Sequence, residues 1–343
     1  MNYLNLVRPL AILAGLILVT HTAHAQNDRI YPRSGSAVIG SVSTTTPQGI
    51  TVKVGGNTQN FVAGEIAKIL FAGDPPALTK GREFALDAQY DQALQELRTI
   101  KIDDLPRDVI KADAMFYTAY AMSQLAIAGK GNKQAARQAM LAFASKHRNS
   151  WHFYEAAKVL GDLALSLDDK EGALRFYGTL RQAPTTTAKI EQVYLTGWVH
   201  LQSGDPDAAI TEFDKVIGLK VDSVDAARLQ SLSKAGKAAA LAAKQQADEG
   251  LQLVSTLIGE LNPTDVEMAA RIYNAQGSVY EAKGDNEGAI MAYLHTHLLF
   301  SGQSDAHAHA LSKLVELWPK VGKPERGAEA RQELQQRYPG FGK

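Results

Sequence analysis

Apolar and polar residues follow two different rhythms along this chain, and the change between them falls near residue 74. Before that point, Ile50, Val52 and Val54 alternate with the polar residues Thr51 and Lys53. A period of two residues is typical of a strand with one buried face. After residue 76 the apolar positions recur every three or four residues in alanine-rich stretches, which predicts amphipathic helices.

Residues 26–73 are predicted to form a small antiparallel β-domain. Gly55-Gly56-Asn57 follows the alternating strand, and these residue types tolerate the positive φ of a hairpin turn. The segments 36–43, 57–62 and 66–71 supply further short strands. This pattern suggests a barrel or sheet of the SH3-like or Sm-like kind, in which closure would remove exposed edges. Because the unit is small, we expect it to pack on the helical part.

The segment Gly73-Asp74-Pro75-Pro76 separates the two parts of the chain. Two consecutive prolines break a strand, and the second can begin a helix. We therefore expect a helical solenoid over residues 74–338, followed by a short tail over residues 339–343.

A repeated pattern runs through the helical part. Four segments place an alanine at one slot, a large side chain four residues later and a glycine twelve residues earlier. The glycine and alanine pairs are Gly81 and Ala93, Gly161 and Ala173, Gly197 and Ala209, and Gly277 and Ala289. The large side chains are Leu97, Tyr177, Phe213 and Tyr293. Small residues at this spacing allow two antiparallel helices to approach closely across a tight turn.

This pattern resembles the tetratricopeptide repeat, and the resemblance covers about 260 residues. It implies a right-handed α-α superhelix of about seven helical hairpins. In that family the small residues at positions 8 and 20 meet, and the large residue at position 24 fills the layer against the next hairpin. Three segments, 108–149, 223–259 and 304–337, fit the pattern loosely. Successive position-8 slots from residue 161 onward are 36 to 41 residues apart, which exceeds the family's repeat of about 34 and predicts longer connections.

The first 25 residues resemble a signal peptide. An apolar run from Pro9 to Val19 follows Arg8 and is too short to span a bilayer. Ala23 and Ala25 place small residues at the −3 and −1 positions of a cleavage site, so the mature chain is expected to begin at Gln26. The leader predicts an exported protein, periplasmic or extracellular. An uncleaved membrane anchor is the alternative interpretation.

Composition narrows the classes of function. The chain has no cysteine, which excludes disulfides, thiolate metal sites and a cysteine nucleophile. Without Arg8 the mature chain has 35 basic residues against 36 acidic ones, a net charge of −1. A nearly neutral chain argues against nucleic acid as a partner. No catalytic motif or phosphate-binding loop is recognisable, so we expect neither enzymatic activity nor a cofactor.

Four histidines lie close together in the sequence: His295, His297, His307 and His309. Two histidines separated by one residue point to different sides of a helix, so neither pair alone can hold one ion. A metal site would need a histidine of each pair to meet across a hairpin boundary. The simpler interpretation is that these are surface and interface histidines, and no metal is expected.

The tetratricopeptide resemblance implies that positions 2, 5, 9 and 12 of each first helix line a concave groove. The partner-binding candidates from this alignment are Glu155, Asp162, Glu191, Tyr194, Trp198, Gln202, Arg271, Asn274 and Glu281. Tyr194 and Trp198 lie one helical turn apart and could form an aromatic shelf for a peptide. The other interpretation of Trp198 is packing between hairpins. The groove lacks the Lys and Arg cluster with which related repeats hold a peptide carboxylate.

Three functions follow from these patterns. The first is a non-enzymatic scaffold that binds a protein or peptide of the cell envelope through the concave face. The second is a self-associating structural component of the envelope, and the third is a metal-binding protein that uses the histidines. The sequence identifies neither the partner nor the oligomeric state.

Overall fold

The computed structural model describes residues 27–262 and 264–341, so the predicted leader lies outside the described residues. The N-terminal part is a five-stranded antiparallel sheet with the order β4-β3-β2-β1-β5. The strands are β1 (Asp28–Pro32), β2 (Val38–Thr46), β3 (Gly49–Val54), β4 (Asn57–Val62) and β5 (Ile66–Leu70). A single 3-10 turn, η1 (Ala63–Glu65), connects β4 to β5.

The predicted small β-domain is confirmed as a sheet. Strands β3 and β4 pair from Gly49 opposite Val62 to Val54 opposite Asn57, as the glycine-rich turn predicts. Strand β1 carries no strong alternating signal in the sequence, yet it lies between β2 and β5 and joins the two halves of the sheet. Strands β4 and β5 form the two edges of this sheet.

The described residues beyond the sheet form fourteen α-helices that pair in sequence order as seven hairpins. The first four pairs are α1 (Pro76–Leu86) with α2 (Tyr90–Leu97), α3 (Asp108–Ile127) with α4 (Lys133–Lys146), α5 (Phe153–Ser166) with α6 (Lys170–Gly178), and α7 (Thr186–Gln202) with α8 (Pro206–Ile217). The remaining pairs are α9 (Val224–Ala243) with α10 (Ala247–Gly259), α11 (Val266–Ala282) with α12 (Asn286–Leu299), and α13 (Ser304–Lys320) with α14 (Pro324–Arg337). Short 3-10 segments, η2 (Ile102–Asp104) and η3 (Thr179–Gln182), lie in two connections.

Helix starts and ends follow the predicted turn chemistry. Gly204 and Gly284 end their helices with φ values of +76° and +74°, a conformation that suits glycine. The side chains of Asp205 and Asp285 then accept hydrogen bonds from the backbone of Ala208 and Gly288 and cap the next helices.

The position-8 glycines make room for the large side chain of their own hairpin. A Cβ atom at Gly161 would lie 2.3 Å from the Tyr177 ring, and one at Gly197 would lie 2.7 Å from the Phe213 ring. The alanines of the repeat are fully buried, as expected for a close helix pair. Phe213 also lies against Gly236 in the next hairpin, so one ring fills the layer between two repeats. The tetratricopeptide resemblance implies that the small residues at positions 8 and 20 contact each other directly. This contact is seen in the loosely matching fifth hairpin, where Gly250 lies against the backbone of Ala238.

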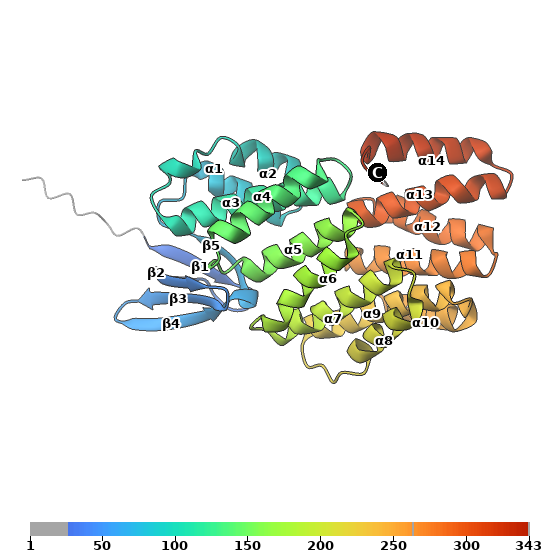
Figure 1. Ribbon diagram of the computed structural model, residues 1–343, viewed down its shortest axis with the longest axis horizontal. Helices are drawn as coiled ribbons and strands as arrows, with labels where there is room; N and C mark the ends of the chain where they lie inside the picture. Colours follow the sequence, from blue (N-terminus) through green and yellow to red (C-terminus); the bar gives the residue numbers. More distant parts are fainter. Residues whose placement is uncertain (1–26, 263, 342–343) are drawn as a thin grey trace, which may run out of the picture.

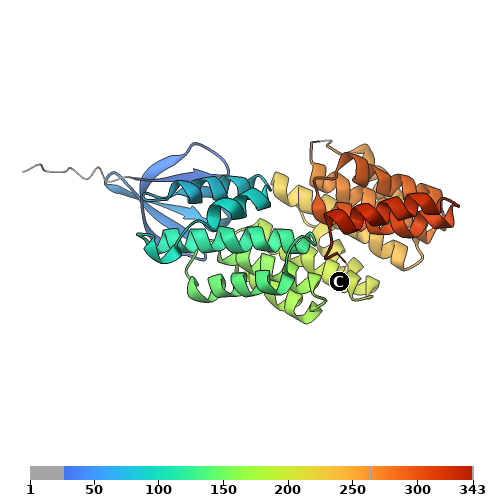
Figure 2. The same ribbon diagram turned by 90° about the horizontal axis from the view of Figure 1, so that it is seen from above.

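The hairpins follow an arc that returns toward its own beginning. Figure 1 shows the arc running from α1–α4 through α7–α10 to α13–α14, and Figure 2 shows the same arrangement from above. At the end of the arc, the backbone amide of Gly340 donates a hydrogen bond to the carbonyl oxygen of Gly129 at 2.8 Å. Lys130 lies over the ring of Tyr338 beside this contact. The C-terminal tail therefore touches the α3–α4 turn of the second hairpin.

The sheet packs on the early helices, as expected for a unit of its size. One continuous apolar core includes Ile30, Val52 and Ile69 of the sheet together with Leu78, Ile110 and other residues up to Leu163 on α5. Gln48 in the β2–β3 turn reaches further along the arc and donates to the hydroxyl of Tyr154 at 2.9 Å. The sheet thus contacts more than the hairpin that follows it in sequence.

The contacts around two helical glycines of the third hairpin predict that their substitution by alanine affects stability differently. We expect Gly161→Ala to lower the free energy of unfolding by about 1–3 kcal/mol, because the added methyl would overlap the buried Tyr177 ring. Gly178→Ala is the control, since a Cβ at that helical position meets nothing within 4 Å and alanine favours helix. Urea unfolding followed by circular dichroism measures both, and equal stability of the two variants would contradict the packing described for Gly161.

Candidate functional site

The first helices of the middle hairpins carry charged residues that pair from one hairpin to the next. On α5, the Lys158 ammonium lies 3.1 Å from Asp162 and 4.0 Å from Glu191 of α7. Two of the predicted groove candidates, Asp162 and Glu191, thus share one cation. The hydroxyl of Tyr177 donates to Asp162 at 2.7 Å and fixes the orientation of this carboxylate.

A second set of paired charges lies on α11 and α13. The Arg271 guanidinium lies 3.3 Å from Glu267 and 3.0 Å from Asp305. Farther along the same face, Glu281 lies 3.4 Å from Lys313. These contacts join the sixth hairpin to the seventh just as Lys158 joins the third to the fourth.

The side chain of Asn274 adds a hydrogen bond in the same direction along the arc. Its amide donates to the carbonyl oxygen of Ala306 at 3.0 Å. The hydroxyl of Tyr293 donates to Glu281 at 2.6 Å and lies 3.2 Å from Ser278. All three predicted candidates on α11 therefore have a partner outside their own helix turn.

The two sets of charges face one another inside the arc. Burial raises the pKa of Tyr90 on α2, the charges of Asp305 and Glu267 raise it further, and Lys158 lowers it. Burial lowers the pKa of Lys158, Asp162 and Glu191 outweigh burial and raise it, and Arg271 acts against them. Electrostatic effects of this kind need short distances. We call the surface formed by the paired charges of α5, α7, α11 and α13 the inner face.

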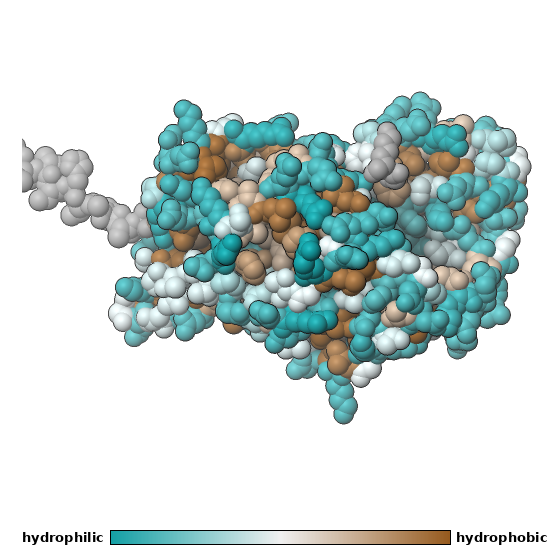
Figure 3. Space-filling model, in the orientation of Figure 1, coloured by the Kyte–Doolittle hydropathy of each residue, from teal (hydrophilic) through white to brown (hydrophobic). Residues whose placement is uncertain are grey.

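The inner face remains accessible to water. The side chains of Lys158, Glu191 and Arg271 keep 34%, 30% and 32% of their surface exposed. Burial nevertheless raises the pKa of Glu191, with Lys158 acting in the opposite direction. Side chains that are surrounded by protein and yet partly exposed to solvent are typical of a concave binding surface. On the side of the molecule seen in Figure 3, hydrophilic side chains predominate and apolar groups form small scattered patches.

The predicted aromatic shelf does not form. Tyr194 is only 6% exposed, because its ring packs against Phe213 within the hairpin core. The ring of Trp198 lies at 5.9 Å from the same phenylalanine in an edge-on arrangement, which supports the packing interpretation of this residue. Gln202 is exposed at the end of α7, and Glu155 faces the ring of His152 at 3.1 Å.

The histidines separate into two groups. His297 and His307 meet across the α12–α13 boundary, with Nδ1 and Nε2 atoms 2.8 Å apart. Glu333 of α14 lies beside both. His295 instead stacks on Tyr273, and His309 packs at the edge of the Tyr293 ring. Burial is the main cause that lowers the pKa of His307 and of His309 to about 4.

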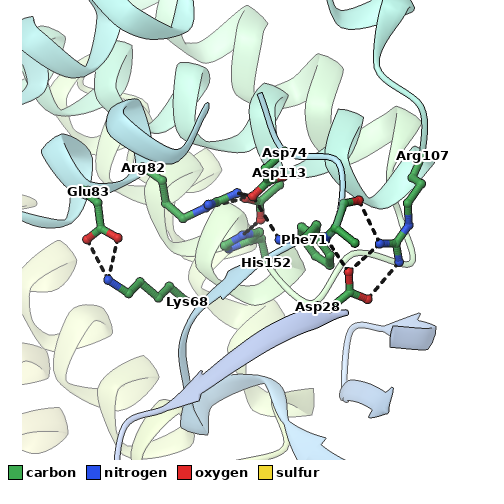
Figure 4. Close-up of polar contacts among 10 residues, drawn as sticks. Asp28, Lys68, Phe71, Asp74, Arg82, Glu83, Arg107, Asp113 and His152 are labelled. Carbon is green, nitrogen blue, oxygen red and sulfur yellow. Dashed lines mark hydrogen bonds and ion pairs between the residues drawn. The ribbon is translucent and has the colours of Figure 1, made fainter. Parts of the chain in front are cut away.

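A buried ionic cluster between the sheet and the helices was not recognisable from the sequence (Figure 4). Arg82 of α1 has no exposed surface and lies 2.9 Å from Asp74 and 2.6 Å from Asp113 of α3. His152, the residue before α5, contacts the other oxygen of Asp113 at 3.0 Å. Burial raises the pKa of Asp74 to about 6, against the influence of Arg82. Burial also opposes ionisation of Asp113, but Arg82 and His152 outweigh it and lower this pKa.

A second ionic contact lies beside this cluster. Asp28 of β1 accepts hydrogen bonds from the backbone amides of Val42 and Ala72 and from both terminal nitrogens of Arg107. Lys68 of β5 reaches Glu83 of α1 at 2.6 Å. In Figure 4 both contacts flank the Arg82 cluster at the boundary between sheet and helices. These partners are far apart in the sequence and come together only in the folded chain. No local sequence pattern identifies them.

None of the helices within residues 27–262 and 264–341 is long and apolar enough to cross a membrane.

Comparisons with known proteins agree with this architecture. Residues 270–295, which span most of the sixth hairpin, match the family model described as Tetratricopeptide repeat. A tetratricopeptide repeat protein from Parabacteroides merdae is similar in structure, with a TM-score of 0.52 and 19% identity over 78% of this chain and 93% of that chain. PilF from Pseudomonas aeruginosa aligns with a TM-score of 0.43 and 16% identity over 67% of this chain and 93% of that one. A search of curated proteins found no match.

The ionic cluster predicts a pH dependence of stability. Burial lowers the pKa of His152, but its hydrogen bonds to Asp113 and Glu155 outweigh burial and hold the pKa above the usual 6.5. A pKa raised by folding stabilises the protein fully below about pH 6.5, and this contribution disappears as pH rises through the folded-state value. We therefore expect the melting temperature to fall as pH rises above about 6.5.

Replacement of the imidazole should remove this dependence. His152→Gln keeps a side chain that can donate to Asp113 and should show a shallower decline over the same pH range. His200→Gln, on α7 and away from the cluster, should keep the decline of the unmodified protein. Calorimetric melts at several pH values measure the slopes, and identical slopes in all three proteins would refute the assignment to His152.

Proposed function

The chain carries an array of tetratricopeptide-type hairpins behind a small β-sheet, and on this premise we propose that it is an exported scaffold that binds a segment of another protein along its inner face. Repeat arrays of this fold use their concave surface to bind partners. The observation that carries the proposal is the two sets of paired, half-exposed charges, one joining the third hairpin to the fourth and the other joining the sixth to the seventh. No catalytic constellation is part of the proposal.

The charges of the inner face favour a basic partner. With Arg228 and Asp265, which pair next to Glu267, the two sets contain six carboxylates and four bases: Asp162, Glu191, Asp265, Glu267, Glu281, Asp305, Lys158, Arg228, Arg271 and Lys313. A net negative surface attracts lysine- and arginine-rich segments and repels acidic ones. This differs from the carboxylate-holding groove of some related repeats, which needs a cluster of basic residues.

Self-association is a second candidate function. Three apolar side chains of α12 are largely exposed: Met291 at 57%, Leu298 at 67% and Leu299 at 65%. Exposed apolar side chains that gather on one element are typical of an interaction surface. Under this alternative, copies of the chain would associate through α12 and form a structural component of the envelope.

Binding to the inner face can be tested with two synthetic peptides of equal length, one rich in lysine and one rich in glutamate. We expect the lysine-rich peptide alone to bind in a fluorescence anisotropy titration, and its affinity to fall as salt is added. The double variant Glu191→Lys, Glu281→Lys should weaken binding by about tenfold or more.

The matched control is the double variant Asp207→Lys, Asp248→Lys, which changes the net charge equally at exposed positions on the second helices α8 and α10. If both double variants weaken binding to the same degree, overall charge and not the inner face attracts the peptide. Should charge reversal prevent folding, Glu191→Gln, Glu281→Gln and Asp207→Asn, Asp248→Asn replace the two pairs. The second candidate function is measured separately, as concentration-dependent sedimentation that a Leu298→Ser, Leu299→Ser variant abolishes.

Export can be tested on the full chain produced with its own leader. We expect protein recovered from the exported fraction to begin at Gln26, because Ala23 and Ala25 match the requirements of leader cleavage. Intact mass spectrometry distinguishes this product from the full chain. An Ala25→Arg variant should keep its leader, while Ala14→Ser inside the apolar run should be processed normally. Recovery of the uncleaved chain in membranes would support the anchor interpretation instead.

A further inference from the structure

The geometry points to a zinc site made by His297, His307 and Glu333, at the place where α12, α13 and α14 meet. The candidate ligand atoms of these three residues all lie within 4.8 Å of one another. The paired charges of the inner face do not include these residues. The inference therefore does not depend on the proposed function.

The distances suit a small divalent ion. His297 Nδ1 lies 2.8 Å from His307 Nε2. Glu333 Oε1 lies 3.9 Å from the same His307 nitrogen. Tetrahedral zinc holds nitrogen and oxygen ligands at about 2.0–2.2 Å, which places neighbouring ligand atoms ~3.3 Å apart. The observed separations bracket this value, so small side-chain rotations would bring all three residues onto one ion.

The surroundings of His307 hold its ring in position. The side chain has no exposed surface, and its Nδ1 lies 2.7 Å from the hydroxyl of the buried Tyr338. Metal-binding histidines usually have a hydrogen-bonding partner on the second ring nitrogen, which fixes the ring and directs the other nitrogen at the ion. Tyr338 supplies this partner, and Nε2 of His307 consequently faces His297 and Glu333.

The type of ligands indicates the type of ion. Two imidazoles and one carboxylate suit zinc and related transition-metal ions, whereas magnesium and calcium prefer oxygen ligands alone. Three protein ligands leave a fourth position for water. The side chains of His297 and Glu333 keep 21% and 34% of their surface exposed, so an ion can reach the site from solvent.

A neighbouring cation competes for the carboxylate. The Arg337 guanidinium lies 3.0 Å from Glu333 Oε1, one turn farther along α14. Binding of zinc would replace part of this ion pair and place two positive charges close together. The arginine therefore weakens the site, and its removal should strengthen zinc binding.

The test uses the full chain after treatment with a chelator, titrated with zinc chloride in a calorimeter. We expect one zinc ion per chain, no saturable binding of magnesium, and visible absorption typical of four-coordinate cobalt when Co²⁺ replaces zinc. His297→Gln and Glu333→Gln should each lower the zinc affinity by about tenfold or more. Arg337→Gln should raise it.

The matched control is His295→Gln, on the same helix two residues away, where the ring stacks on Tyr273 outside the cluster. Zinc should raise the melting temperature of the unmodified protein and of His295→Gln, but not that of His297→Gln. Melts without zinc show whether each variant is folded. The site is refuted if the unmodified protein shows no saturable binding, or if His295→Gln and His297→Gln lose zinc affinity equally.

Discussion

The arrangement of the first three hairpins depends on a guanidinium buried between carboxylates. Arg82 lies between Asp74 and Asp113, and His152 completes the cluster. Transfer of such charges from water is costly, and the loss of one partner would leave an uncompensated charge in the interior. Because these residues come from the inter-domain segment, α1, α3 and the start of α5, the cluster fixes three hairpins in one register. Apolar contacts alone would allow many more relative orientations.

The charges of the inner face are paired like those of the buried cluster, but their side chains are partly exposed to water. Lys158 pairs with Asp162 and Glu191, and Arg271 pairs with Glu267 and Asp305, so these charges already have partners within the chain. A partner that disrupts these ion pairs must supply charges of the same sign as those it displaces. A partner with charges of the wrong sign would bind much more weakly. Such a surface is better suited to discrimination between partners than to tight binding of many segments.

Local patterns in the sequence were sufficient for the repeat and for much of the sheet. Glycine and alanine at fixed spacing identified the hairpins, since Gly161 must accommodate Tyr177 in any close pair of helices. Tyr194 was predicted on the surface because its repeat position usually faces the groove, but the large Phe213 ring keeps it in the core. The pairing of Arg82 with Asp113 depends on the three-dimensional path of the chain, which periodicity does not reveal.

The hydrogen bond between Gly340 and Gly129 changes how the array should fold. In an open solenoid each repeat touches only its neighbours, so terminal repeats fray and the stability of the array is close to a sum over nearest-neighbour contacts. Contact between the last segment and the second hairpin adds a non-local interaction to this one-dimensional system. Loss of structure at either end then removes support from the other end. The chain should consequently unfold more cooperatively, and fold more slowly, than an open array of seven such hairpins.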